Sequence, residues 1–171
     1  MADENSRAVI QRHQYADYLN IGNSTTPNYV LMGVGFTTLD ESPGAKTNTK
    51  KYVNEKTSST SIVSYESQFP FESDLIKSQD AVIALYNVGR NHYTGADAEF
   101  EYVRVELWDQ AENEGTPVEN TYAARKFRVA CEVSDISGED DQVVKGNLNA
   151  IGDPVFGTFN TQTKTFTETA A

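Results

Sequence analysis

Apolar and polar side chains alternate along much of this chain, and this period of two predicts β-strands. Two runs show this alternation most clearly. In the first, the side chains on the inward face are Val63, Tyr65, Ser67, Phe69 and Phe71, and in the second they are Phe127, Val129, Cys131 and Val133. Less regular apolar segments predict further strands over residues 28–39, 98–108, 142–151 and 154–160, and a strand or extended arm over 9–21. Pro70 lacks an amide donor, so the first run is expected to lie at a sheet edge or to end there.

One segment, residues 74–89, departs from this alternation and has helical spacing. The apolar positions that share one side of the predicted helix are Leu75, Val82, Ile83 and Tyr86. Ser73 or Ser78 is expected to cap its start, and Gly89 suits its C-terminal end. The pattern as a whole predicts a mainly β fold, a β-sandwich or barrel, with one flanking α-helix.

Two long polar segments interrupt the strands, and a third closes the chain. Within residues 43–61, only Tyr52 and Val53 could contribute to a core, so 41–61 is predicted to be a long protruding loop. Residues 110–121 predict a second polar loop, and the Thr-rich residues 161–171 a flexible tail. Residues 1–160, including both loops, are expected to form a single domain.

Composition favours a folded protein made in a reducing compartment. Hydrophobic residues make up 38% of the 171 positions, and nine Tyr and eight Phe provide more aromatic material than a disordered chain carries. The single cysteine, Cys131, excludes an internal disulfide. The N-terminal residues lack the apolar stretch of a signal peptide, and no run approaches the roughly 20 apolar residues of a membrane span. We therefore expect a soluble protein with no membrane partner.

The charge of −11 is unevenly distributed, which changes this picture. The overall sign argues against stable nucleic-acid binding, because phosphates would be repelled. Residues 97–119 carry eight acids against the single base Arg104: Asp97, Glu99, Glu101, Glu106, Asp109, Glu112, Glu114 and Glu119. The predicted loop is the opposite, since it holds four of the eight lysines against one acid, Glu55: Lys46, Lys50, Lys51 and Lys56. A basic loop on an acidic protein suggests a contact with a partner.

Catalytic groups are sparse. His13, His92 and Cys131 could form a nucleophile and base only if the fold brought them together. Cys131 lies on the inward face of a predicted strand, where a lone cysteine usually acts as a small core residue. The acidic turn at residues 135–141 could bind Ca²⁺, but it lacks the spacing of an EF-hand, and a solvated turn is the simpler interpretation. An enzyme is therefore disfavoured, and no cofactor or metal is expected.

Several phrases, in order along the chain, resemble a known family. They are "YVLMGVGFTTLDESPGAKTNTKKYVNEKTSS", "YESQFPFESDLI" and "VGRNHYTGADAEFEYVRVELW". Residues 10–133 are similar in this way to the major tail protein, or tail tube protein, of long-tailed (siphovirus-type) bacteriophages. The resemblance is a succession of phrases without a catalytic signature, and the region after residue 142 shares less of it.

The resemblance implies a tail-tube-like virion protein that is assembled in the host cytoplasm. Six copies would form a ring, and stacked rings would form a hollow tube that conducts DNA during ejection without binding it stably. The implied partners are further copies of the chain, a tape measure protein, a tail terminator and distal tail proteins. Glu66 and Glu132 lie opposite apolar strand faces, so they are candidates for lining the lumen, where carboxylates would repel DNA at short range.

The basic loop acquires a role in this setting. Fully extended, about 20 residues span at most roughly 60 to 70 Å, which is enough to reach a neighbouring subunit. Its inter-subunit residues are expected to be Lys46, Lys50, Lys51, Tyr52 and Lys56. The acidic segment expected to receive them contains Asp97, Glu99, Glu101 and Glu106.

A binding module is the alternative interpretation. A carbohydrate-binding or adhesin domain of a phage tail would use aromatic side chains to stack on sugars. Tyr65 and Trp108 are candidates, although their positions in predicted strands are explained more simply by core packing. A monomer that binds glycans would favour this alternative, and a concentration-dependent polymer would favour the tube.

Overall fold

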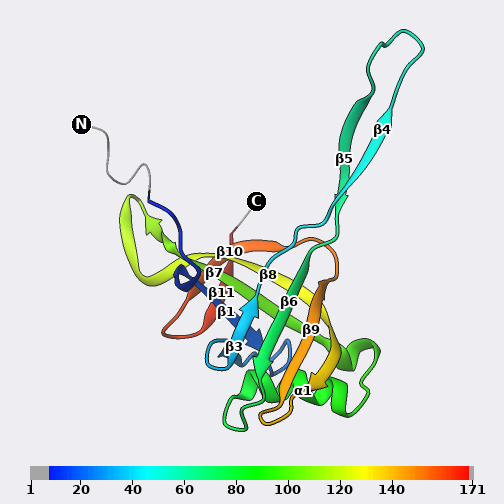
Figure 1. Cartoon of the computed structure of the whole chain (residues 1–171). Helices are drawn as coiled ribbons and strands as arrows, with labels where there is room; N and C mark the ends of the chain where they lie inside the picture. Colours follow the sequence, from blue (N-terminus) through cyan, green and yellow to red (C-terminus); the bar gives the residue numbers. More distant parts are fainter. Residues whose placement is uncertain (1–7, 170–171) are drawn as a thin grey trace.

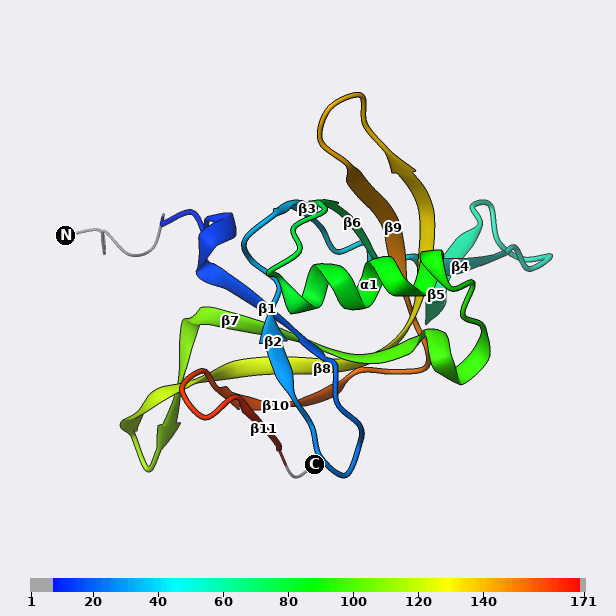
Figure 2. The ribbon, with the colours of Figure 1, turned by 90° about the horizontal axis from the view of Figure 1, so that it is seen from below.

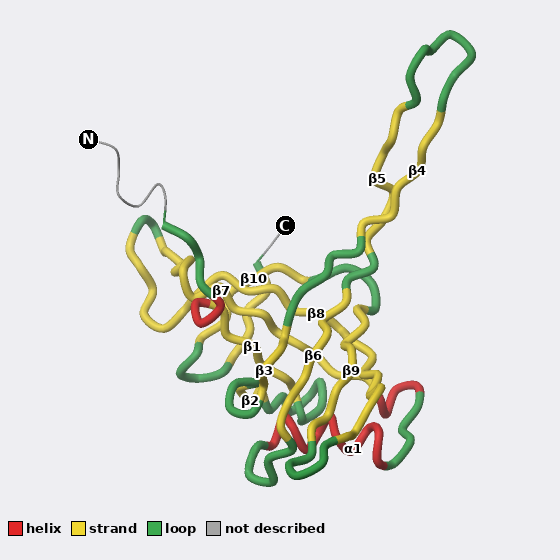
Figure 3. The backbone as a smooth tube through the Cα atoms, in the orientation of Figure 1, coloured by secondary structure: helices red, strands yellow, loops and turns green. Residues whose placement is uncertain are grey.

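A strongly curled β-sheet forms the body of the protein, and one helix packs inside its curve (Figure 1). The computed structural model describes residues 8–169, so the first seven and last two residues of the predicted domain and tail lie outside the description. Within this range the strands form a half-barrel sheet with a separate two-stranded hairpin that projects from it (Figure 3). The predicted mainly β fold with one flanking helix is confirmed.

The main sheet contains nine strands within residues 8–169, all antiparallel to their neighbours. Its strands are β1 (Tyr15–Asn20), β2 (Tyr29–Leu31), β3 (Phe36–Leu39), β6 (Gln68–Asp74), β7 (Glu99–Asn113), β8 (Thr116–Ser137), β9 (Val143–Ala150), β10 (Val155–Asn160) and β11 (Thr165–Glu168). The order is β2-β1-β7-β8-β9-β6-β3. The long β8 also pairs with β10 along its first half, and β11 follows β10.

Both faces of the central strands are buried, each in its own core. On one face, Phe69, Tyr102 and Phe127 pack together beneath the helix, with ring centroids of Phe69 4.8 and 4.7 Å from the other two. On the other face, β10 folds over β1 and β7, and Phe159 packs against Tyr18 at 4.5 Å between centroids. The uninterrupted burial of residues 102–105 follows from this arrangement.

The helix α1 (Asp80–Arg90) covers the first of these cores (Figure 2). Its buried side chains are Ala81, Val82, Leu85 and Val88. The predicted serine cap is wrong, because the helix begins after Gln79, and Ser73 is buried in β6. Gly89 lies inside the helix, which ends at Arg90. A Cβ at Gly89 would approach Cγ1 of Val133 to 2.8 Å, so this glycine permits close packing on β8.

Strand boundaries differ from the prediction at two places. The predicted strand over residues 63–71 is broken at 66–67, and Val63 and Tyr65 are about 60% exposed because they belong to the projecting hairpin. The predicted polar loop at 110–121 is mostly strand, because β7 and β8 continue beyond the body as a hairpin. Its turn is the pair Glu114 and Gly115, whose φ angles of 50° and 80° suit a two-residue hairpin.

Two further segments differ in detail. Pro70 lies in the middle of β6 rather than at an edge or end. Its carbonyl accepts a hydrogen bond from the Asp40 amide at 3.1 Å, on the side where β3 ends, so the missing N–H interrupts no pairing with β9. In the Thr-rich C-terminal segment, residues 165–168 form β11, because Phe166 packs against the second core. No helix among the described residues is long and apolar enough to cross a membrane.

Candidate functional site

The segment expected to be a long loop forms an ordered arm. Strands β4 (Ala45–Lys50) and β5 (Ser59–Tyr65) pair as an antiparallel hairpin that projects from the body (Figure 1). Every residue of both strands is exposed, so no part of the arm contributes to either core. Polar cross-strand contacts hold it, including a 2.9 Å hydrogen bond between the hydroxyls of Thr49 and Thr60. We call residues 45–65 the arm.

The tip of the arm carries a positive charge. The tip consists of Lys50, which ends β4, and the turn at residues 51–58. It carries Lys50, Lys51 and Lys56 against a single acid, Glu55, which gives a formal charge of +2. Tyr52 is 60% exposed beside them. The predicted arm residue Lys46 is not at the tip. It lies at the root of the arm, where the hairpin joins the body, and pairs with Glu66 at 3.1 Å. The tip is therefore the part of the arm whose lysines are available to a partner.

An acidic hollow of about 730 Å³ lies on the sheet face away from α1. We call it the acidic hollow, and its lining residues are Asn20, Gly22, Asn23, Ser24, Ala96, Asp97, Glu99, Phe100, Glu101, Lys126, Arg128, Asp153 and Val155. Four carboxylates face two cations there, which gives a formal charge of −2. Three of the predicted acidic partners, Asp97, Glu99 and Glu101, meet in this hollow.

The acids of the hollow are not equally available. Arg128 donates from Nε to Glu99 at 2.8 Å, and Glu101 accepts hydrogen bonds from Asn20 at 3.2 Å and Tyr29 at 3.0 Å. By contrast, neither exposed Asp97 nor exposed Asp153 forms an ion pair within residues 8–169. These two carboxylates are the ones that can accept a cation from outside.

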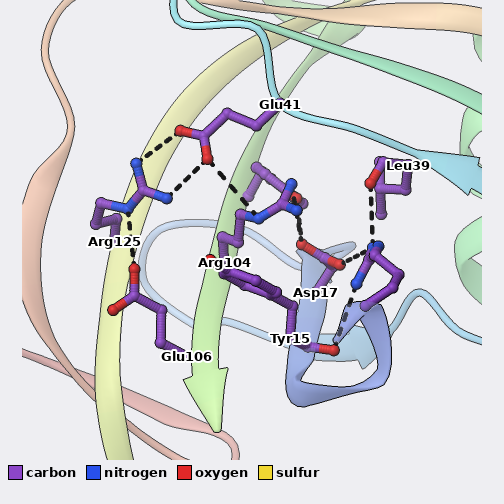
Figure 4. Close-up of polar contacts among 9 residues, drawn as sticks. Tyr15, Asp17, Leu39, Glu41, Arg104, Glu106 and Arg125 are labelled. Atoms are coloured by element: carbon purple, nitrogen blue, oxygen red, sulfur yellow. Dashed lines mark hydrogen bonds and ion pairs between the residues drawn. The ribbon is translucent and has the colours of Figure 1, made fainter. Parts of the chain in front are cut away.

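The fourth predicted acid, Glu106, belongs to a different place. It lies 3.9 Å from Nε of Arg125, in a network that also contains Asp17, Glu41 and Arg104 (Figure 4). Burial raises the pKa of Glu106, against the lowering effect of the Arg125 charge. Glu106 therefore belongs to this half-buried network and does not line the hollow.

Sequence reasoning missed this network. Asp17 is 1% and Arg104 5% exposed, and Tyr102 donates its hydroxyl proton to Asp17. Burial, followed by the charge of Asp17, raises the pKa of Tyr102 well above its ordinary value, so this hydroxyl remains a donor. For Glu41, burial alone would raise the pKa, but the hydrogen bond and charge of Arg125, with the charge of Arg104, lower it.

The remaining predicted residues have these surroundings. Exposed Glu66 pairs with Lys46 at the arm root, and exposed Glu132 accepts a 3.3 Å hydrogen bond from Asn149, so their place in a lumen stays a prediction. Core packing is the wrong explanation for Tyr65 and Trp108, which are 61% and 42% exposed.

The residues considered for catalysis lie on separate elements. His13 is in the 3₁₀ turn η2 (Arg12–Gln14), His92 follows α1, and Cys131 is buried in β8. Burial, with a smaller contribution from the Glu132 charge, raises the pKa of Cys131 to about 12. Within residues 8–169, no three His, Cys, Asp or Glu side chains are grouped to hold a metal.

The folded protein is accordingly expected to resist a maleimide at neutral pH. Both the burial of Cys131 and its raised pKa keep the reactive thiolate scarce. Mass spectrometry should show no adduct on the native chain and one adduct after denaturation. Rapid labelling of the native chain would contradict the core role of this side chain.

The comparisons with solved structures found several similar chains, one of which is described here. No protein-family model and no curated protein matches the chain. A chain in the cryo-EM structure of the anti-feeding prophage baseplate, six-fold symmetrised, is similar with a TM-score of 0.48 and 8% sequence identity. The similarity covers 91% of this chain and 98% of that chain, so it extends over nearly the whole length of both.

Proposed function

We propose that this protein is a structural subunit of a phage-type tail and that it assembles with further copies of itself. The arm is the observation that carries the proposal. A two-stranded hairpin is at best marginally stable by itself in water, yet both strands of this one are exposed throughout. It also displays Ile62, Val63 and Tyr65, each about 60% exposed. Such an arm gains stability when a partner covers it.

A second copy offers the matching surface. The arm tip has a formal charge of +2 and the acidic hollow −2, so the two attract each other at short range. Val155 also lines the hollow, where it can contact Tyr52 of the tip. Complementary charge of this kind guides the encounter of two surfaces and fixes their register.

The contact must join different molecules. The arm projects away from the body (Figure 1), whereas the residues that line the hollow belong to the main sheet and the segments beside it. An arm on one copy and a hollow on the next make a heterologous contact, which generates rings or filaments. Within residues 8–169, the outer strands β2, β3 and β11 each pair with one other strand and leave an edge on which neighbouring copies can pair.

The finer proposal is a tail tube. The resemblance to major tail proteins supports stacked hexameric rings around a lumen, assembled with a tape measure protein, a terminator and distal tail proteins. The charge of −11 suits a conduit through which DNA passes without being held.

Purified protein is expected to form rings or hollow tubes above a threshold concentration. Negative-stain electron microscopy and light scattering over a concentration series measure this directly. Because the arm contact is charged, the threshold should rise when salt increases from about 0.1 M to about 1 M, where the screening length falls from about 10 Å to about 3 Å. A chain that stays monomeric at every concentration, also with preformed tube fragments added as seeds, would contradict the proposal.

A further inference from the structure

The root of the arm is where the hairpin joins the body. The chain leaves β3 after Leu39 and returns to β6 at Gln68. Between these points, Ser42 and Gln68 exchange two backbone hydrogen bonds of 2.8 Å, and the Glu66 amide donates to Gly44 at 3.0 Å. These bonds join the two strands of the root to each other. Two more tie the root to the edge of the sheet, since the Asp40 amide donates to Pro70 of β6 at 3.1 Å and the Ala150 amide donates to Ser67 at 2.9 Å. None of these backbone bonds joins the root to β7 or β8.

Two guanidinium groups connect the root to η2 and to β8. Arg12, from η2, donates to the carbonyl oxygen of Leu39 at 3.1 Å. Arg125, from β8, donates two hydrogen bonds to Glu41 at 2.7 and 2.8 Å. Paired, charge-assisted bonds of this kind fix orientation as well as distance. Leu39 and Glu41 are therefore both held just before the arm begins.

Buried charges link the two contacts (Figure 4). Asp17 accepts from Arg12 at 2.6 Å, and Arg104 lies 3.9 Å from Asp17 and 3.9 Å from Glu41. The guanidinium of Arg104 also lies over the ring of Tyr15, 4.8 Å from its centroid. The charges of Arg12, Arg104 and Arg125 alternate with those of the carboxylates, so the set acts as one unit. We call these five residues, Arg12, Asp17, Glu41, Arg104 and Arg125, the mount.

We infer that the mount fixes the direction in which the arm projects, and that Glu41 is its principal positioning residue. The geometry makes a small angle at the root important. Lys50 lies nine residues beyond Glu41 along the chain, a length of at most about 30 Å at 3.3 Å per residue. A tilt of about 15° at the root would move the tip by about 8 Å, twice the reach of an ion pair. A loosely held arm would miss its target most of the time.

The direction of the arm is a property of the single chain, and only its consequence for assembly rests on the proposed function. An arm already held in its binding direction loses less conformational freedom on docking, which lowers the concentration needed for assembly. Glu41 performs this role without touching a partner. Its effect should therefore be visible in the isolated monomer.

Double electron–electron resonance can measure the direction of the arm. Spin labels would be placed at Val53→Cys on the tip and Lys164→Cys in the turn between β10 and β11, in a Cys131→Ala background, with excess unlabelled chain. The reference chain should give one narrow distance distribution. Glu41→Gln keeps the shape of the side chain but removes its charge, and it should broaden the distribution at least about twofold.

Two further variants separate positioning from general stability. Glu72→Gln removes a half-buried carboxylate that lies 3.7 Å from Lys145 on β9 and is not part of the mount, and it should leave the distribution unchanged. Arg125→Lys keeps the charge but cannot form the paired bonds, so it should broaden the distribution even if Glu41→Gln fails to fold. Equal widths in Arg125→Lys and the reference chain would overturn the inference.

Tube formation is read separately by electron microscopy. If Glu41→Gln broadens the distance distribution but the natural sequence forms no tubes, the role of the mount is supported and the proposed function is refuted. If the natural sequence forms tubes but the variants have unchanged distance distributions, the role of the mount is refuted and the proposed function is supported. If the proposed function and the role of the mount are both correct, Glu41→Gln should need a concentration about tenfold higher to assemble.

Discussion

Replacing Lys50 and Lys51 with glutamate is expected to abolish assembly at concentrations where the natural sequence forms rings or tubes. The change turns the formal charge of the arm tip from +2 to −2, against a hollow of −2. Each exposed ion pair contributes about 0.2–1 kcal/mol, and each repulsion opposes binding by a similar amount. Two lost attractions and two new repulsions total about 1–4 kcal/mol per contact. Because 1.4 kcal/mol corresponds to a tenfold change in affinity, the threshold concentration should rise roughly fivefold to a thousandfold.

Light scattering at low salt, with electron microscopy of the same samples, measures this threshold. The matched control is Lys77→Glu with Lys164→Glu, which makes the same charge change at exposed positions outside the arm. Adding Asp97→Lys and Asp153→Lys to the arm variant reverses the hollow as well and should restore assembly. Unchanged assembly of Lys50→Glu with Lys51→Glu at low salt would show that charge does not hold the arm in place.

The sequence predicted the basic character of the arm but not its structure. The lack of core residues and the density of lysines separated residues 41–61 from the acidic body. The hairpin was missed because neither of its strands has a buried face, and the alternation at Val63 and Tyr65 was assigned to a strand of the body. The pairing depends on cross-strand contacts such as that of Thr49 with Thr60.

The body was predicted best where one face of a strand is buried. Residues 127–133 alternate clearly because Phe127, Val129 and Cys131 enter the core while Arg128 and Glu132 remain exposed. The strand β7 gave a weaker signal because two cores bury residues 102–105 on both faces. Periodicity cannot reveal a second core, since this depends on where β10 folds in space.

The mount had no signal in the sequence. Arg125 and Glu41 are 84 residues apart, and no local motif accompanies either. Among the residues that contact the mount, the sequence analysis assigned a role only to Glu106, as an inter-subunit residue. Its half-buried position beside Arg125 does not favour that role. The hollow was more accessible to sequence reasoning, because Asp97, Glu99 and Glu101 are close together on the chain. Asp153 reaches the hollow only through the fold.

Asp17→Ala is expected to cause the largest loss of stability among single substitutions in the mount. The Asp17 carboxylate accepts from Tyr102 and Arg12 and lies beside Arg104, and its side chain is 1% exposed. Its removal leaves the buried charge of Arg104 with one carboxylate fewer, and breaking a buried pair in this way costs about 3–5 kcal/mol. For a chain of this size, that corresponds to a fall in Tm of roughly 6–20 °C.

Thermal and urea unfolding of the monomer measure the effect. Asp109→Ala removes an exposed carboxylate and should change the free energy of unfolding by less than about 0.5 kcal/mol. Combining Asp17→Ala with Arg104→Met removes the stranded charge and should recover part of the loss. Equal stability of Asp17→Ala and Asp109→Ala would mean that the buried charges contribute little to folding. Because Asp17 also holds Arg12 beside the arm root, assembly of Asp17→Ala should fail at temperatures where its monomer is still folded.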